Sequence, residues 1–182
     1  MNILICVGIM AVTAWIESLM GRLPFCKCGI VGLWSGNIWS SQNSQQLADP
    51  YTFTHMLHGV LWYSLIWLIF PKRITLLQRL VIAVAFESGW EILENSNFII
   101  DRYRTATISL DYYGDSIFNS MGDILAMAFG FLVTSRMPIR WMAMGAVVLD
   151  LVLLWWIHDN LALNIIMLIH PVAALRNWQL LR

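Results

Sequence analysis

Apolar segments long enough to cross a lipid bilayer are the feature that most limits what this chain can fold into. A membrane-spanning helix needs about 20 mostly apolar residues. Hydrophobic residues make up 59% of the 182 residues and charged residues only 12%, a balance that soluble domains rarely have. The sequence therefore predicts an all-α integral-membrane protein, with residues 1–182 forming a single domain.

The apolar runs predict a polytopic transmembrane helix bundle of about six helices. The predicted spans are residues 3–19, 54–70, 74–94, 116–135, 141–157 and 161–175. We interpret the first run as a retained helix rather than a cleaved signal peptide, because no basic residue precedes it and no small-residue cleavage motif clearly follows. Pro71 breaks the second helix. The last run is short and contains Pro171, so a re-entrant segment is the alternative to a sixth span.

The distribution of basic residues predicts how this bundle is oriented. The formal net charge is zero and there is no basic arm, so a nucleic-acid partner is not indicated. With six spans, the inner side holds seven basic residues: Lys72, Arg73, Arg79, Arg136, Arg140, Arg176 and Arg182. The outer side holds four: Arg22, Lys27, Arg102 and Arg104. This difference predicts that both termini are cytoplasmic, whereas five spans would give five basic residues inside and six outside.

Ionisable residues form three helical stripes near the predicted outer side. His55 and His58 are spaced i, i+3, so they share one helix face. The other stripes are Glu87, Glu91 and Glu94, and Asp115, Asn119 and Asp123. A charge at the centre of a spanning helix costs at least about 2.5 kcal/mol, and such residues face a protein interior or a wet cavity. We therefore expect the three stripes to meet in one polar cavity.

The residue types in these stripes indicate metal or acid–base chemistry. Two histidines with nearby carboxylates suit Zn, Mn or Fe, which makes a divalent metal the candidate cofactor. A bound metal would activate water or polarise a substrate oxygen. The candidate metal ligands are His55, His58, Glu87 and Glu91, and the candidate catalytic residues are these four with Asp123. The candidate substrate-binding residues are Arg102, Arg104, Glu94, Asp115 and Asn119.

Each of these residues also has a structural interpretation. Buried histidines and carboxylates bond membrane helices together, so His55 bonded to Glu91 would need no chemistry. Asp115 is a candidate N-cap for residues 116–135, and the two arginines are candidate snorkelling residues. Gly122 and Gly130 are expected to allow close helix packing. The tryptophans at helix ends, Trp90 among them, are interpreted as an interfacial belt without a role in the site.

The three cysteines do not predict a disulfide framework. Cys26 and Cys28 are separated by one residue, a spacing that forms a bridge only with strain, so we treat them as candidate ligands. An unpaired thiol facing an oxidising compartment would otherwise be a liability.

Short motifs along nearly the whole chain resemble a family of bacterial inner-membrane proteins. They are GRLPFCKCG, SSQNSQ, YTFTHMLHG, E-x-x-x-E-x-x-E-N, DRYRTATISLDYYGDS, N-x-x-G-D and DNLALNIIMLIHP. The family is known as domain of unknown function 2585, or uncharacterised protein family 0314. The resemblance implies a multi-pass inner-membrane protein and brings no established activity. Gln42, Gln46 and Pro50 depart from the family pattern, which argues against the loop that contains them supplying essential ligands.

The order of His, Glu, Arg, Asp and Asn-x-x-Gly-Asp more distantly resembles the VanZ-like membrane proteins. The resemblance implies the same residues: His55 or His58, Glu87 or Glu91, Arg104, Asp115, Asn119 and Asp123. Our leading hypothesis is an enzyme or binding protein of the cell envelope that handles a lipid or lipid-linked substrate, with Arg102 and Arg104 holding an anionic headgroup. The alternatives are a small transporter or ion-coupled carrier, and an assembly factor whose polar core is structural.

Overall fold

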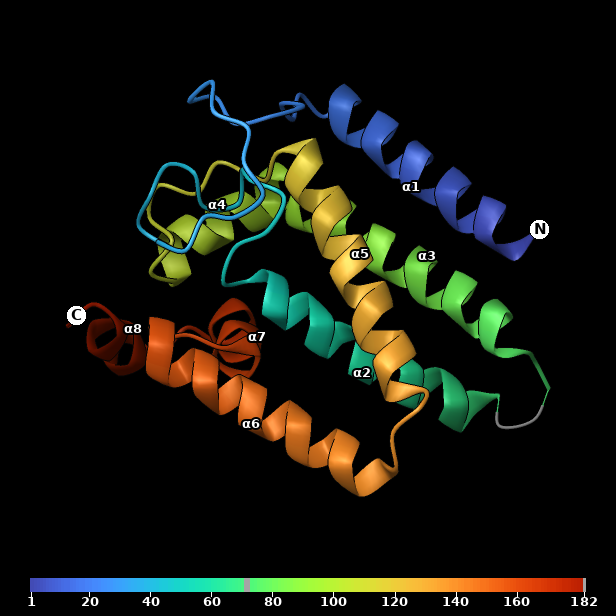
Figure 1. The fold of residues 1–182 in the computed structure, drawn as a ribbon. Coiled ribbons are helices and arrows are strands. Elements are labelled where there is room, and N and C mark those ends of the chain that lie inside the picture. Colours follow the sequence, from blue (N-terminus) through green and yellow to red (C-terminus); the bar gives the residue numbers. More distant parts are fainter. Residues whose placement is uncertain (71–72, 182) are drawn as a thin grey trace.

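A computed structural model describes residues 1–70 and 73–181 of the chain as a helical bundle (Figure 1). Pro71, Lys72 and Arg182, which the sequence analysis used as a helix breaker and as basic residues, lie outside the described residues. The helices are α1 (Asn2–Leu19), α2 (Thr52–Ile69), α3 (Leu76–Glu94), α4 (Asn97–Ala106), α5 (Ile117–Thr134), α6 (Ile139–Ile157), α7 (Leu161–Ile169) and α8 (Ala173–Gln179). Residues 1–70 and 73–181 contain no strand, which confirms the predicted all-α class.

Side-chain caps explain where several of these helices begin. Thr75 and Gln78 form a reciprocal capping box at the start of α3, and Ser96 caps α4. The cap of α5 is Ser116, whose hydroxyl accepts the backbone N–H of Asn119. The prediction that Asp115 caps this helix was therefore wrong. Both residues can cap a helix, but the side chain of Asp115 accepts a hydrogen bond from Asn95 instead.

Three helices in the described part of the chain are long and apolar enough to cross a membrane: α1, α5 and α6. This is fewer than the six spans predicted. The helices α2 and α3 have 18 and 19 residues, but the histidines of α2 and the glutamates of α3 reduce their apolar character. The predicted sixth span, 161–175, is divided between α7 and α8. At 1.5 Å per residue α7 is about 14 Å long, too short for the hydrocarbon core.

The missing sixth crossing changes the expected position of the C-terminus. The N-terminus lies at the end of the bundle where α2 is joined to α3, and the C-terminus lies at the opposite end, near α4 and α7 (Figure 1). Without a sixth span, the basic residues of the sequence divide five against six between the two sides. That difference is too small for the positive-inside rule to set an orientation, so the orientation stays a prediction.

Small residues let α2 and α5 pack closely, the most extensive helix contact in the bundle. A Cβ atom added at Gly59 would meet the backbone of Met127 and Phe131, and one added at Gly130 would meet the backbone of Met56. Gly122 lies in the same way against the carbonyl of Leu47. The predicted role in close helix packing is confirmed for Gly130, whereas Gly122 lets the loop before α2 lie close to α5.

We expect Gly130→Ala to destabilise the protein by about 1 to 3 kcal/mol, because a methyl group there must push the backbone of α2 away. Gly145→Ala in α6 is the matched control, since a Cβ atom at that position has no atom within 4 Å. Alanine favours a helix more than glycine does, so this variant should be as stable as the wild type or more so. Thermal unfolding in detergent measures both. Equal midpoints would contradict the close packing.

A cluster of buried apolar side chains fills the middle of the bundle. It consists of Ile66, Ala83, Val84, Ile124, Met127 and Phe131, contributed by α2, α3 and α5. On each of these helices the cluster lies toward the end that holds the α2–α3 connection. The polar stripes predicted from the sequence lie on the other side of this cluster, toward α4 and α7.

Candidate functional site

A cavity of about 560 Å³ lies at the end of the bundle where α4 and α7 are found. Its walls come from residues 38–49, the first half of α2, the end of α3, residues 103–115, the start of α5 and one face of α7. Six predicted site residues line it: His55, His58, Glu94, Asp115, Asn119 and Asp123. The helical spacing in the sequence therefore predicted correctly that the three stripes converge.

One carboxylate, Glu87, organises the histidines of α2. Its Oε1 lies 2.7 Å from Nδ1 of His55 and 2.9 Å from Nδ1 of His58. Its Oε2 accepts the indole N–H of Trp62 at 2.8 Å. These three partners are spaced i, i+3 and i+7 on α2, so one helix face is bonded to a single acid. Glu87 is fully buried, and both of its oxygens have partners.

The second acid on α3, Glu91, is in the opposite situation. It is fully buried, and neither of its carboxylate oxygens has a hydrogen-bond partner. Its Oε1 lies 3.3 Å from Nδ1 of His55, a nitrogen that Glu87 already engages at the shorter distance. On the other side of the ring, Nε2 of His55 faces Oδ2 of Asp123 at 3.9 Å. The Oδ1 of Asp123 is also without a partner.

These contacts define groups of side chains with the spacing of metal ligands. In the described residues, ligand atoms of His55, Glu91 and Asp123 lie within 4.8 Å of one another, and so do those of His55, His58 and Glu87. The predicted ligands His55, His58, Glu87 and Glu91 are thus brought together, and Asp123 joins them. Buried carboxylates without partners are costly, and a cation at His55, Glu91 and Asp123 would remove that cost.

A third group consists of Glu91, Glu94 and Asp115. Asp115 accepts a hydrogen bond from Nδ2 of Asn95 at 3.1 Å, and Glu94 accepts one from the hydroxyl of Tyr103 at 2.9 Å. Burial, followed by the charge of Asp49, raises the pKa of Asp115 to about 7. This acid therefore changes its charge near neutral pH, and it lies on the cavity wall.

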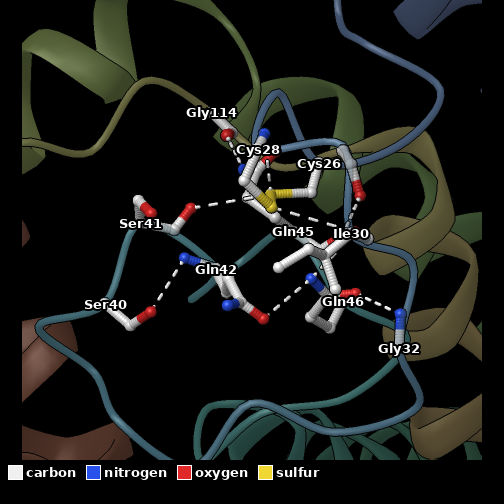
Figure 2. The surroundings of a disulfide bond; sticks show 11 residues. Cys26, Cys28, Ile30, Gly32, Ser40, Ser41, Gln42, Gln45, Gln46 and Gly114 are labelled. Atoms are coloured by element: carbon white, nitrogen blue, oxygen red, sulfur yellow. Dashed lines mark hydrogen bonds between the residues drawn. A yellow bond between two sulfur atoms is a disulfide. The ribbon is translucent and has the colours of Figure 1, made fainter.

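The loop between α1 and α2 covers one side of the cavity. Nε2 of Gln45 donates to the carbonyl of Gly114 at 2.8 Å, and Nδ2 of Asn119 donates to the carbonyl of Gln46 at 2.8 Å. Figure 2 shows these glutamines beside a disulfide between Cys26 and Cys28, whose S–S distance is 2.11 Å. In the sequence these cysteines are candidate ligands, whereas in the structure they are bonded to each other, with their Cα atoms 5.1 Å apart.

The two arginines predicted to bind substrate do not line the cavity. Nε of Arg102 donates to the carbonyl of Leu168 at 2.8 Å and Nη2 donates to that of Ile169 at 3.2 Å, so this side chain caps the C-terminus of α7. Nε of Arg104 donates to the carbonyl of Tyr112. Both guanidinium groups therefore satisfy backbone carbonyls next to the cavity.

Several cavity residues were missed in the sequence. Trp90 lines the cavity and packs edge-on against His58, with ring centroids 6.0 Å apart, so the interpretation of Trp90 as a belt residue was wrong. Trp62 could have been found, because it follows His55 by seven residues on the same face. Asp49 is buried and accepts the backbone N–H groups of Ser44 and Tyr51 at 2.7 Å each, which fixes the entry into α2.

Asp159 joins the cavity end of the bundle to α8. Its Oδ1 accepts the backbone N–H of Asn160 and the side-chain amide of Gln179. Its Oδ2 accepts the hydroxyl of Tyr51 and the side-chain amide of Asn164, each at 3.2 Å. This one carboxylate therefore connects the α6–α7 turn with α7, α8 and the start of α2.

The stability of this junction should depend on pH. Burial raises the pKa of Asp159 from its ordinary 3.8 to about 6, although the donors around it partly offset the shift. The folded protein thus binds the proton of Asp159 more tightly than the unfolded chain does. The contribution of this protonation to the free energy of unfolding is therefore fully present below pH 3.8 and is lost as pH rises through about 6. We expect Asp159→Asn to reduce the fall in thermal midpoint between about pH 4 and pH 7. An unchanged fall would contradict the assignment.

Three apolar helices suited to a membrane and one interior cavity of histidines and carboxylates define the class of this protein: an all-helical protein with a polar site near one end. The chain belongs to the family described as "Protein of unknown function (DUF2585)", whose sequence profile matches residues 18–181. This confirms the family resemblance seen in the short motifs.

Relatives cover almost the whole chain. This chain is 49% identical over 174 residues to a UPF0314 protein of Sinorhizobium fredii. The alignment covers 96% of this chain and 88% of the relative. It is 50% identical over 161 residues to one of Paracoccus denitrificans, which covers 88% and 82%. A UPF0314 protein of Sphingopyxis alaskensis is 47% identical over 178 residues, covering 97% and 93%. No solved structure matches significantly, and the VanZ-like resemblance stays a prediction.

Proposed function

We propose that the protein is a metal-dependent membrane protein that holds a divalent ion at His55, Glu91 and Asp123 and acts on an amphiphilic molecule in the cavity. The observation that carries this proposal is the contrast between two buried acids on α3. Glu87 has three hydrogen-bond partners, whereas both oxygens of Glu91 have none. A purely structural polar core would leave neither acid without partners.

In this proposal Glu87 orients the histidines and does not bind the metal. A histidine that binds a metal through one ring nitrogen usually donates the other to a carboxylate. Glu87 occupies Nδ1 of His55 and His58, which leaves Nε2 of each ring for other partners. Nε2 of His55 lies on the side of Asp123. An ion held there would supply Lewis acidity or an activated water, and Glu94 or Asp115 would accept the proton.

The cavity lining favours a neutral or cationic headgroup. The described lining residues include five acids, Asp49, Glu94, Asp111, Asp115 and Asp123, and no lysine or arginine. Leu61, Leu161 and Ile165 supply an apolar side for a hydrocarbon chain. The anionic headgroup expected from Arg102 and Arg104 receives less support, because both side chains bond to carbonyls.

The disulfide supports a position of the cavity outside the cytoplasm. Cys26 and Cys28 lie in the loop that covers the cavity, and disulfides persist mainly in oxidising compartments. This agrees with the predicted inner-membrane protein whose site faces the periplasm. A transporter is less favoured, because the apolar cluster of Ile66, Met127 and Phe131 follows directly below the site.

Metal analysis of the purified protein tests the proposal. We expect about one zinc, manganese or iron ion per chain after purification in detergent without chelator. His55→Ala and Asp123→Asn should weaken metal binding by more than the roughly 10- to 100-fold that changes to outer ligands cost. His170→Ala is the control, since this histidine is exposed at the end of α7.

Two results would overturn the proposal. One is wild-type protein that neither contains nor takes up any of these metals while remaining folded. The other is equal metal binding by the His55→Ala and His170→Ala variants, which would place any bound ion elsewhere.

A further inference from the structure

The Cys26–Cys28 disulfide contributes little to holding the fold together. A disulfide stabilises a protein mainly by closing a loop of the unfolded chain, and the effect grows with loop length. This pair has a sequence separation of 2, so it closes nearly the shortest loop that two cysteines can form. The loop from Gly21 to Pro50 is held to the bundle by other contacts, such as the bond from Gln45 to Gly114. The presence of this disulfide is therefore better explained by its reactivity than by a contribution to stability.

The two sulfurs are in different environments. Cys26 is 6% exposed, whereas Cys28 lies on the surface. The Sγ of Cys26 accepts the backbone N–H of Cys28 at 3.2 Å. Lys27, between them, is also exposed. A donated backbone N–H favours a thiolate, so Cys26 is a suitable leaving group. Cys28 is the sulfur that a reagent in solvent can reach.

The loop also has a hydrogen-bond acceptor near each sulfur for the reduced thiols. The carbonyl of Ser41 lies 3.9 Å from Sγ of Cys26, and the carbonyl of Ile30 lies 3.8 Å from Sγ of Cys28 (Figure 2). A disulfide has no S–H to donate, so these carbonyls become partners only after reduction. Each sulfur therefore has an acceptor carbonyl near it for use after reduction.

We propose that Cys26 and Cys28 form a thiol–disulfide exchange site that reacts with dithiols. The thiolate of an external dithiol attacks Sγ of Cys28, the Cys26–Cys28 bond breaks, and Cys26 leaves as a thiolate. The second external sulfur, as a thiolate, then attacks the sulfur that the dithiol bonded to Cys28. Cys28 leaves as a thiolate and the external dithiol becomes a disulfide. Two electrons pass to the cysteine pair, and both of its thiolates take up protons.

Thiol counting after reduction tests the pair itself. Purified Cys6→Ser protein, which removes the remaining free cysteine, is treated with dithiothreitol without denaturant and labelled with a maleimide of known mass. We expect two labels per chain after reduction and none after reoxidation with oxidised dithiothreitol. A pair that resists reduction until the protein is denatured would overturn the proposal.

Single-cysteine variants test the direction of attack. In the Cys6→Ser background, Cys26→Ser leaves Cys28, and Cys28→Ser leaves Cys26. We expect Cys28 to form a mixed disulfide with a small aromatic disulfide reagent at least about tenfold faster than Cys26, because reactivity follows exposure. Equal rates, or faster reaction of Cys26, would overturn the proposed roles. A double variant with both cysteines replaced should keep the wild-type thermal midpoint and metal content, so the outcome does not depend on the proposed metal site.

Discussion

Replacing Glu87 by alanine is expected to lower the free energy of unfolding by about 3 to 5 kcal/mol, the range for breaking a buried polar cluster. Glu87 accepts hydrogen bonds from His55, His58 and Trp62. Alanine would leave three buried or half-buried donors without an acceptor, and each such group is costly. Chemical denaturation of the detergent-solubilised protein, followed by tryptophan fluorescence, measures the change.

Glu94→Ala is the matched control for this variant. Glu94 lies two turns further along α3 and accepts a single hydrogen bond, from Tyr103, so its loss should cost about 1 kcal/mol. Glu87→Gln, which keeps one acceptor oxygen, should fall between the two. Equal losses for Glu87→Ala and Glu94→Ala would mean that the three-donor arrangement around Glu87 does not hold the native bundle.

Replacing Glu91 by glutamine is expected to change stability in opposite directions with and without metal. In metal-free protein the variant removes a buried carboxyl group that has no partner, which should stabilise the fold by about 1 to 3 kcal/mol. With metal at 1,000 times its dissociation constant, the wild type gains about 4.1 kcal/mol, which exceeds the stabilisation expected of the metal-free variant. The variant, which lacks one proposed ligand, should lose most of that gain. Thermal unfolding with chelator and with added zinc measures both effects.

Glu94→Gln provides the comparison for Glu91→Gln, because it removes the same charge from the same helix without removing a ligand of the proposed ion. The change that Glu94→Gln causes in the thermal midpoint should have the same sign with chelator and with added zinc. If Glu91→Gln also showed no reversal, Glu91 would not bind a metal, and the proposal would reduce to a polar core that joins the helices.

Helical periodicity was sufficient to predict which stripes meet. His55 and Glu87 are 32 residues apart in the sequence, yet they are bonded at 2.7 Å, because apolar surroundings leave ionisable side chains only one favourable direction. The same reasoning placed Asp123 beside them and identified Gly130 as a packing position. The all-α class followed from the apolar runs alone.

Other features depend on local geometry that periodicity does not contain. The spacing of Glu87 and Glu91 gave no indication that the first would have three partners and the second none. Arg102 directly follows Asp101 in the sequence, but its guanidinium group donates to the carbonyls at the end of α7. The turn that joins Cys26 to Cys28 depends on backbone angles such as the φ of 76° at Gly29. Composition cannot predict contacts of these kinds.

The packed apolar cluster of Ile66, Met127 and Phe131 has a consequence for the proposed function. In the proposed function, packed apolar side chains close the inner end of the cavity, so a molecule that enters from one leaflet would leave into that same leaflet. Reactant and product would then use the same entrance to the cavity. Product that accumulated in that leaflet would compete with the reactant and slow turnover.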